Sequence, residues 1–140
     1  MNMVMNKKLR VSLVIPAYNE ERHLRQCLDA IAAQSVQPFE VILVDNNSSD
    51  KTVAVAREYP FVRLLSAPRQ GVVFARNVGF NAARGDVIGR IDADTVIDTN
   101  WVATIQAIFI ERDIDAVSGA VRGNDIAFVS TVPLVHVCHR

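Results

Sequence analysis

The chain has 140 residues, of which 50% are hydrophobic and 21% charged, and its fifteen Lys and Arg residues balance its fifteen Asp and Glu residues. This length fits one domain that buries a substantial core, and the composition is that of an ordinary globular protein. A net charge of zero argues against a general nucleic-acid binder, because such binding needs clustered excess cations.

Cysteine usage and hydropathy favour a cytoplasmic protein. Only Cys27 and Cys138 occur, which offers neither a disulfide framework nor a paired-cysteine metal site. No apolar run approaches the roughly 20 residues of a membrane span, and lysines interrupt residues 1–8 before a secretory core could form. We expect a cytoplasmic location, and peripheral association with a membrane surface stays open.

Short apolar segments alternate with segments of helical periodicity along the chain. The first kind is rich in β-branched residues, as strands are, and the second repeats apolar residues every three or four positions, as helices do. The expected strands are residues 9–15, 40–45, 61–66, 86–92 and 115–121, and the expected helices begin after Asn19, near Val53, after Gly71 and after Asn100. This alternation predicts an α/β domain with a Rossmann-like, mostly parallel sheet and helices on both faces.

Individual residues are expected to set the ends of these elements. Pro16 should end the first strand, because proline cannot donate to a sheet ladder. Asn19 and Asn100 are expected to be N-caps. Gly85 should close the third helix.

Polar and acidic residues follow the ends of the first four predicted strands, as PAYNE, DNNSSD, APRQG and DADTVID. The carboxyl ends of parallel strands meet at one edge of the sheet, where α/β proteins bind ligands. The sequence therefore predicts a site at this edge. It contains no glycine fingerprint of a dinucleotide fold and no P-loop, which excludes both usual phosphate cradles.

Asp92 and Asp94 stand one residue apart after an apolar strand. Each carboxylate raises the cost of ionising the other, and a bound cation would relieve that repulsion. Such oxygen ligands suit Mg²⁺ or Mn²⁺, which take one or two carboxylates together with substrate phosphates. The alternative is that both aspartates only form a turn.

Four segments, VSLVIPAYNEE, VILVDNNSSDKT, GVVFARNVGFNAARGD and IGRIDADT, resemble successive motifs of glycosyltransferase family 2, the nucleotide-sugar transferases of the A-type fold. They follow the family's order between Val11 and Thr95. The resemblance implies an inverting, metal-dependent hexosyltransferase that uses Mn²⁺ or Mg²⁺. The implied partners are a nucleoside-diphosphate sugar as donor and a sugar, lipid or protein as acceptor.

The resemblance also implies roles for individual residues. Those implied for the nucleotide-sugar are Pro16, Ala17, Tyr18, Glu20, Asp45, Arg76 and Asp92. Asp45 would contact the base or ribose, and Arg76 would reach the base. Asp94 would be the direct metal ligand, with Asp92 beside it and nearer the ribose.

No catalytic base is assigned, because in the family this carboxylate lies in a second half of the domain, after the matched region. We expect a tail at 1–8, a nucleotide-sugar-binding domain at 9–123, and at 124–140 a tail or the start of an acceptor-side half.

A non-catalytic fragment that binds the nucleotide-sugar stays an alternative, and self-association stays open. Which nucleotide, sugar and acceptor are used is not predicted.

One segment fits a second family. RIDADTVI resembles the D-x-D-x-[TV] signature of haloacid dehalogenase-like phosphatases, in which Asp92 would be the nucleophile. In that family the motif opens the domain and a lysine follows it, whereas here most of the chain precedes Asp92 and no lysine follows Asp94. We therefore rank the phosphatase below the transferase.

Overall fold

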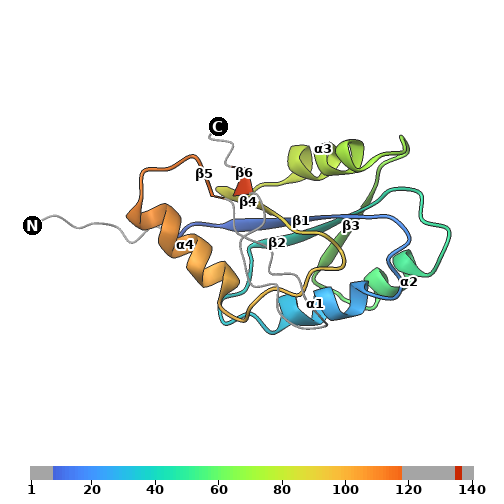
Figure 1. Ribbon diagram of the computed structural model, residues 1–140, viewed down its shortest axis with the longest axis horizontal. Coiled ribbons are helices and arrows are strands. Elements are labelled where there is room, and N and C mark those ends of the chain that lie inside the picture. The colour runs from blue at the N-terminus through green and yellow to red at the C-terminus, as the bar shows by residue number, and fades with distance from the viewer. Residues whose placement is uncertain (1–7, 118–134, 137–140) are drawn as a thin grey trace, which may run out of the picture.

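The computed structural model describes residues 8–117 and 135–136. Within these ranges six strands form one sheet in the order β3-β2-β1-β4-β6-β5, which Figure 1 shows with its helices. The strands are β1 Val11–Ala17, β2 Glu40–Asp45, β3 Val62–Ser66, β4 Val87–Arg90, β5 Ala116–Val117 and β6 Val135–His136. The helices are α1 Leu24–Ala32, α2 Thr52–Arg57, α3 Val72–Ala82 and α4 Trp101–Glu111.

The sheet is mostly parallel. β1 lies between β2 and β4 and is parallel to both, and β3 is parallel to β2. The short β6 is antiparallel to β4 and to β5. The predicted fold class is confirmed, while most of the strand expected at 115–121 lies outside the described residues.

The helices cover both faces of the sheet, as Figure 1 shows, with α3 on one face and α1, α2 and α4 on the other. The larger core joins alternate residues of β1, such as Leu13 and Ile15, to these three helices. The smaller core lies under α3 and includes Val14 and Ala75. Gly79 allows α3 to approach the sheet closely, because a Cβ there would overlap Val14.

Pro16 does not end the first strand, which runs to Ala17. Pro16 lies opposite Val44 of β2. The backbone polar groups of Val14 face β4, because its carbonyl oxygen accepts from Ile91 N at 3.1 Å. Pro16 follows Val14 by two residues, so its nitrogen faces the β4 side as well. The pairing of β1 with β4 stops at Val14 and Arg90. The missing N–H of proline therefore removes no ladder bond.

Asn19 and Gly85 also act differently from their predicted roles. Asn19 has φ of +53°, and its Oδ1 accepts from Ser49 N at 2.8 Å, so it joins two loops while His23 occupies the N-cap of α1. α3 ends at Ala82, before Gly85. Gly85 N instead donates to Ser12 Oγ at 2.8 Å, which attaches the loop before β4 to β1.

Candidate functional site

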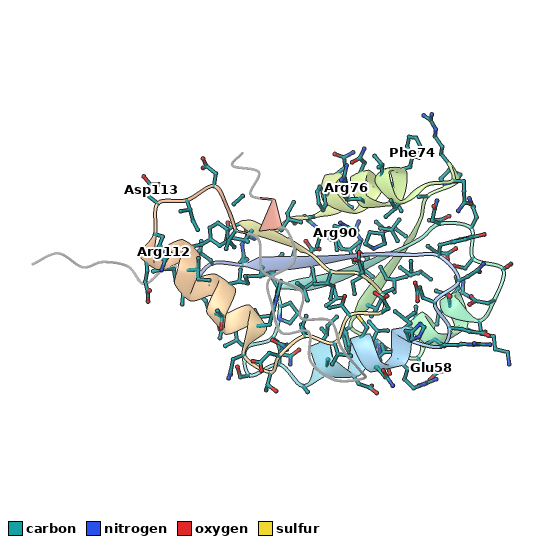
Figure 2. All side chains as sticks on the ribbon, in the orientation of Figure 1. Glu58, Phe74, Arg76, Arg90, Arg112 and Asp113 are labelled. Atoms are coloured by element: carbon teal, nitrogen blue, oxygen red, sulfur yellow. The ribbon has the colours of Figure 1, made fainter. Side chains whose placement is uncertain are left out.

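A cavity of about 470 Å³ lies at the carboxyl ends of the central parallel strands. The residues that line it are Pro16, Ala17, Tyr18, Glu20, Asn46, Gln70, Gly71, Val72, Ala75, Asp92, Ala93 and Asp94. The end of β1, the loops after β2, β3 and β4, and the start of α3 therefore meet there, and Figure 2 shows the side chains of this region on the ribbon. The position agrees with the general rule for ligand sites in parallel α/β sheets.

The end of β4 presents the two aspartates to the cavity. Residues 91–94 alternate between buried and exposed, with Ile91 and Ala93 in the core and Asp92 and Asp94 exposed. Thr95 N donates to Asp92 O at 3.0 Å and turns the chain directly afterwards. The buried neighbours thereby fix the backbone, and both carboxylates stay open to a ligand.

A buried thiol lies beneath the acidic group. Cys27 of α1 is fully buried, and its Sγ donates to Asp92 O at 3.8 Å. Burial, followed by the negative charges of Asp94, Asp92 and Glu20, raises the pKa of the Cys27 thiol to about 12. The negative charges of these three carboxylates thus all reach the buried thiol.

Asn46 holds the opposite wall. It is 2% exposed, and its Nδ2 donates to the carbonyl oxygens of Ala67 at 2.9 Å and Arg69 at 2.8 Å. Its Oδ1 accepts from Gly71 N at 2.8 Å and from Gln70 Nε2 at 3.3 Å. One amide therefore fixes the loop from β3 to α3, which supplies Gln70, Gly71 and Val72 to the cavity.

Six of the eight residues predicted to bind donor or metal line this one cavity: Pro16, Ala17, Tyr18, Glu20, Asp92 and Asp94. Two do not. Asp45 is half-buried at the end of β2, where its Oδ1 accepts from Ser48 N at 3.3 Å. Arg76 follows the cavity residue Ala75, but its guanidinium lies 5.9 Å from the ring of Phe80. The binding roles of all eight stay predictions.

The sequence analysis gave no individual role to the other half of the lining, although four of these residues lie in the polar segments expected at this edge: Asn46, Gln70, Gly71, Val72, Ala75 and Ala93. A signal existed for Asn46, which directly follows a predicted strand and opens a polar loop. None existed for Val72 and Ala75, because an apolar residue near a helix start reads as core. Val72 is 56% exposed, whereas Ala75 is fully buried.

The residues present fit a divalent cation that shares its ligands with a substrate. The described residues contain no group of three or more His, Cys, Asp or Glu side chains arranged to hold a metal ion alone. They do place Asp92 and Asp94, both exposed, at one cavity. Two hard carboxylates that leave room for phosphate oxygens and water are the usual protein contribution to an Mg²⁺ or Mn²⁺ site.

The fold and the cavity define an α/β domain with a cavity at the carboxyl-end edge of its parallel strands, lined by two exposed aspartates. The chain matches the sequence profile described as "Glycosyl transferase family 2" over residues 12–135. It belongs to glycosyltransferase family 2, and the resemblance found in its sequence is confirmed. The same match covers the whole D-x-D segment, which leaves the phosphatase alternative without support.

Individual relatives agree with the family. The chain is 31% identical over 116 residues to the uncharacterized glycosyltransferase YibD of Escherichia coli, a match that covers 80% of this chain and 34% of that protein. The chain spans about a third of the length of the curated relatives that it matches first.

Two solved structures show the same fold. The mannosyltransferase PcManGT of Pyrobaculum calidifontis, in complex with GDP-Man and Mn²⁺, has a TM-score of 0.76 and 27% identity, with 84% of this chain and 37% of that chain covered. TarS 1–349 of S. aureus, in complex with UDP-GlcNAc, has a TM-score of 0.77 and 23% identity, with 88% of this chain and 37% of that chain covered. In the described part of the chain, no helix is long and apolar enough to cross a membrane.

Proposed function

We propose that this chain forms the donor-binding part of an inverting, metal-dependent glycosyltransferase that moves a sugar from a nucleoside diphosphate to an acceptor hydroxyl. The observation that carries the proposal is the meeting of two distant motifs. Pro16, Ala17 and Tyr18 come from the end of β1, Asp92 and Asp94 come from the end of β4, and all five line one cavity. The proposed occupant is the nucleotide-sugar.

The cavity has the mixture of surfaces that this donor needs. Tyr18 is 52% exposed and offers an aromatic face on which a base can stack. The acidic side chains of the same cavity, Glu20, Asp92 and Asp94, offer only oxygen ligands, so a negatively charged diphosphate requires a cation beside them. PcManGT, bound to GDP-Man and Mn²⁺, supports this arrangement by analogy.

The proposed chemistry divides between a cation and the chain. Asp94, with Asp92 beside it, would hold Mn²⁺ or Mg²⁺, which when bound neutralises negative charge that grows on the leaving diphosphate. The chain's own residues orient the nucleotide at Tyr18 and keep the sugar end near the acidic group. Inversion also needs a base for the acceptor hydroxyl, and we assign none of the described residues to that role.

The direct test is thermal stabilisation of the purified chain by UDP, GDP and dTDP and their sugars, with and without Mn²⁺. We expect at least one of them to raise the melting temperature only when Mn²⁺ is present, and Asp94→Ala to abolish that rise. Glu111→Ala, an exposed carboxylate at the end of α4, is the matched control and should keep the rise. No shift with any nucleotide would contradict donor binding.

The non-catalytic alternative is tested with the same protein. The chain spans about a third of the length of the relatives it matches first, so donor binding and turnover must be measured separately. Release of free sugar or its transfer to an added acceptor identifies an active transferase. Metal-dependent stabilisation without either product identifies a module that only binds the nucleotide-sugar.

A further inference from the structure

One guanidinium stands beside the acidic pair and has no part in the roles given above. Arg90 is the last residue of β4, and its Nη2 donates to Asp92 Oδ1 at 2.6 Å. The Arg90 side chain is 26% exposed, against 60% for that of Asp92. Figure 2 shows Arg90 in the middle of the molecule, near the end of its strand. Arg90 is therefore the less exposed member of the pair.

Among the described residues, Asp92 is the one hydrogen-bond partner of the Arg90 guanidinium. Its Nε is buried and has no hydrogen-bond partner among the described residues. The bond to Asp92 is the one hydrogen bond that the described part of the chain gives this group. A charge-assisted bond of this kind is stronger than a neutral one, and a buried donor left unpaired is costly. Arg90 thus has a physical reason to stay on Asp92.

We propose that Arg90 is a positioning residue that neutralises Asp92 until the donor arrives, so that the acidic pair binds a divalent cation tightly only together with a diphosphate. This inference rests on the proposed function, because it concerns the order in which cation and donor bind. It differs from a metal-ligand role, since Arg90 acts through Asp92 and not on the cation itself.

The charges give the effect its direction. Asp92 and Asp94 together carry −2, and Arg90 reduces the sum to −1 because it pairs with Asp92. One Asp92 oxygen is already engaged by Arg90, whereas within the described residues Asp94 has no hydrogen bond or ion pair. A diphosphate brings its own negative charge and oxygen ligands, which offset the guanidinium. A nearby unit charge changes the affinity for a divalent ion by about tenfold, even with strong solvent screening.

The test is a titration of the chain with Mn²⁺ alone, in which electron paramagnetic resonance measures the free ion. We expect Arg90→Met to bind Mn²⁺ about five- to tenfold more tightly than the unchanged chain, because it frees Asp92 and removes a positive charge. A residue with a merely structural role would show the opposite sign, since its loss loosens the site. Unchanged or weaker Mn²⁺ binding by the folded variant overturns the proposal.

Two further variants separate the Asp92 pair from a general charge effect. Arg112→Met removes an exposed arginine at the end of α4, which Figure 2 places far along the ribbon from Arg90. It should leave Mn²⁺ affinity unchanged, and an equal gain would overturn the proposal. In an Asp92→Asn background the gain from Arg90→Met should fall by at least half. A full gain there would show that Arg90 does not act through Asp92.

Adding the nucleotide separates this inference from the proposed function. UDP or GDP should increase Mn²⁺ affinity in the unchanged chain, after correction for Mn²⁺ held by the nucleotide itself, and should increase it less in Arg90→Met. Equal enhancement in both chains overturns the binding order. If no nucleotide acts on the unchanged chain, the proposed function fails, while the Mn²⁺-only titration still reports on the Arg90–Asp92 pair. Should Arg90→Met not fold, Arg90→Gln replaces it with the same expectations.

Discussion

The two ends of the parallel strands use charged residues in opposite ways. At the amino ends, Glu40 Oε1 accepts from Ser12 Oγ at 2.7 Å and from Arg84 N at 2.6 Å. Ser12 Oγ in turn accepts from Gly85 N at 2.8 Å. At the carboxyl ends, Asp94 is exposed beside a cavity and, within the described residues, has no hydrogen bond or ion pair.

The difference indicates which polar residues maintain the fold and which are available to a ligand. A buried polar group must be hydrogen-bonded or it destabilises the protein, and the network around Ser12, which is fully buried, meets that demand. At the carboxyl ends, Asp92 is paired with Arg90, but Asp94 is kept without a partner among the described residues beside that second carboxylate, which is tolerated where function needs it. Substitutions at the two ends should therefore separate stability from binding.

The largest expected effect comes from Asn46→Asp, which should lower both the stability of the fold and the affinity for nucleotide. The substitution keeps the side-chain shape but replaces the amide donor that faces the carbonyl oxygens of Ala67 and Arg69 with a negative oxygen. We expect a loss of about 3 kcal/mol in the free energy of unfolding, measured by urea denaturation, and weaker nucleotide binding.

Acid provides a second check on Asn46→Asp. Protonation would restore a donor toward one of the two carbonyl groups, so the deficit should shrink as the pH falls. Asn47→Asp is the matched control, because this exposed residue also donates to a carbonyl oxygen, that of Pro68 at 3.0 Å. It should cost much less, and an equal cost would contradict the importance of burial at Asn46.

The next effect is that of Gly85→Ala, at the amino ends of the strands. An added Cβ would lie 2.7 Å from Arg10 O and 2.9 Å from Ser12 N, both of which are backbone atoms that cannot turn aside. We expect a loss of about 2 kcal/mol in the free energy of unfolding from this overpacking. The folded fraction should bind nucleotide and Mn²⁺ with unchanged affinity, and reduced affinity would break the separation between the two ends.

A smaller effect is expected for Glu40→Gln, which keeps the size of the side chain and removes its charge. Two donors then bond to a neutral oxygen, and hydrogen bonds to neutral acceptors are weaker. We expect a loss of about 1 kcal/mol in the free energy of unfolding. Glu58→Gln, at an exposed carboxylate that accepts from Arg25 at 2.7 Å, is the control, and its melting temperature should stay within experimental error.

The sequence predicted the order of the elements and the edge that carries the site, because strand and helix periodicity are local properties. It also placed Asp92 and Asp94 together, since alternation within four residues keeps both on one side. It placed Asn46 in a polar loop at this edge, but it could not predict the four bonds of its side chain, which all go to the loop between β3 and α3. Nor could it predict Asn19 as a link between loops, because the partners of both asparagines are set by tertiary contacts.

Asp94→Asn should give the smallest change in stability, and it tests the comparison between the two ends of the strands most sharply. Asp94→Asn removes an exposed carboxylate that lies near Asp92 and Glu20 at one cavity. Since the charge repels its neighbours and pairs with none of the described residues, its loss should raise the melting temperature slightly, with a free-energy change within about 0.5 kcal/mol. Mn²⁺-dependent nucleotide binding should disappear in the same protein. A clear fall in stability would mean that Asp94 helps to hold the fold, and the division between the two ends of the strands would then be wrong.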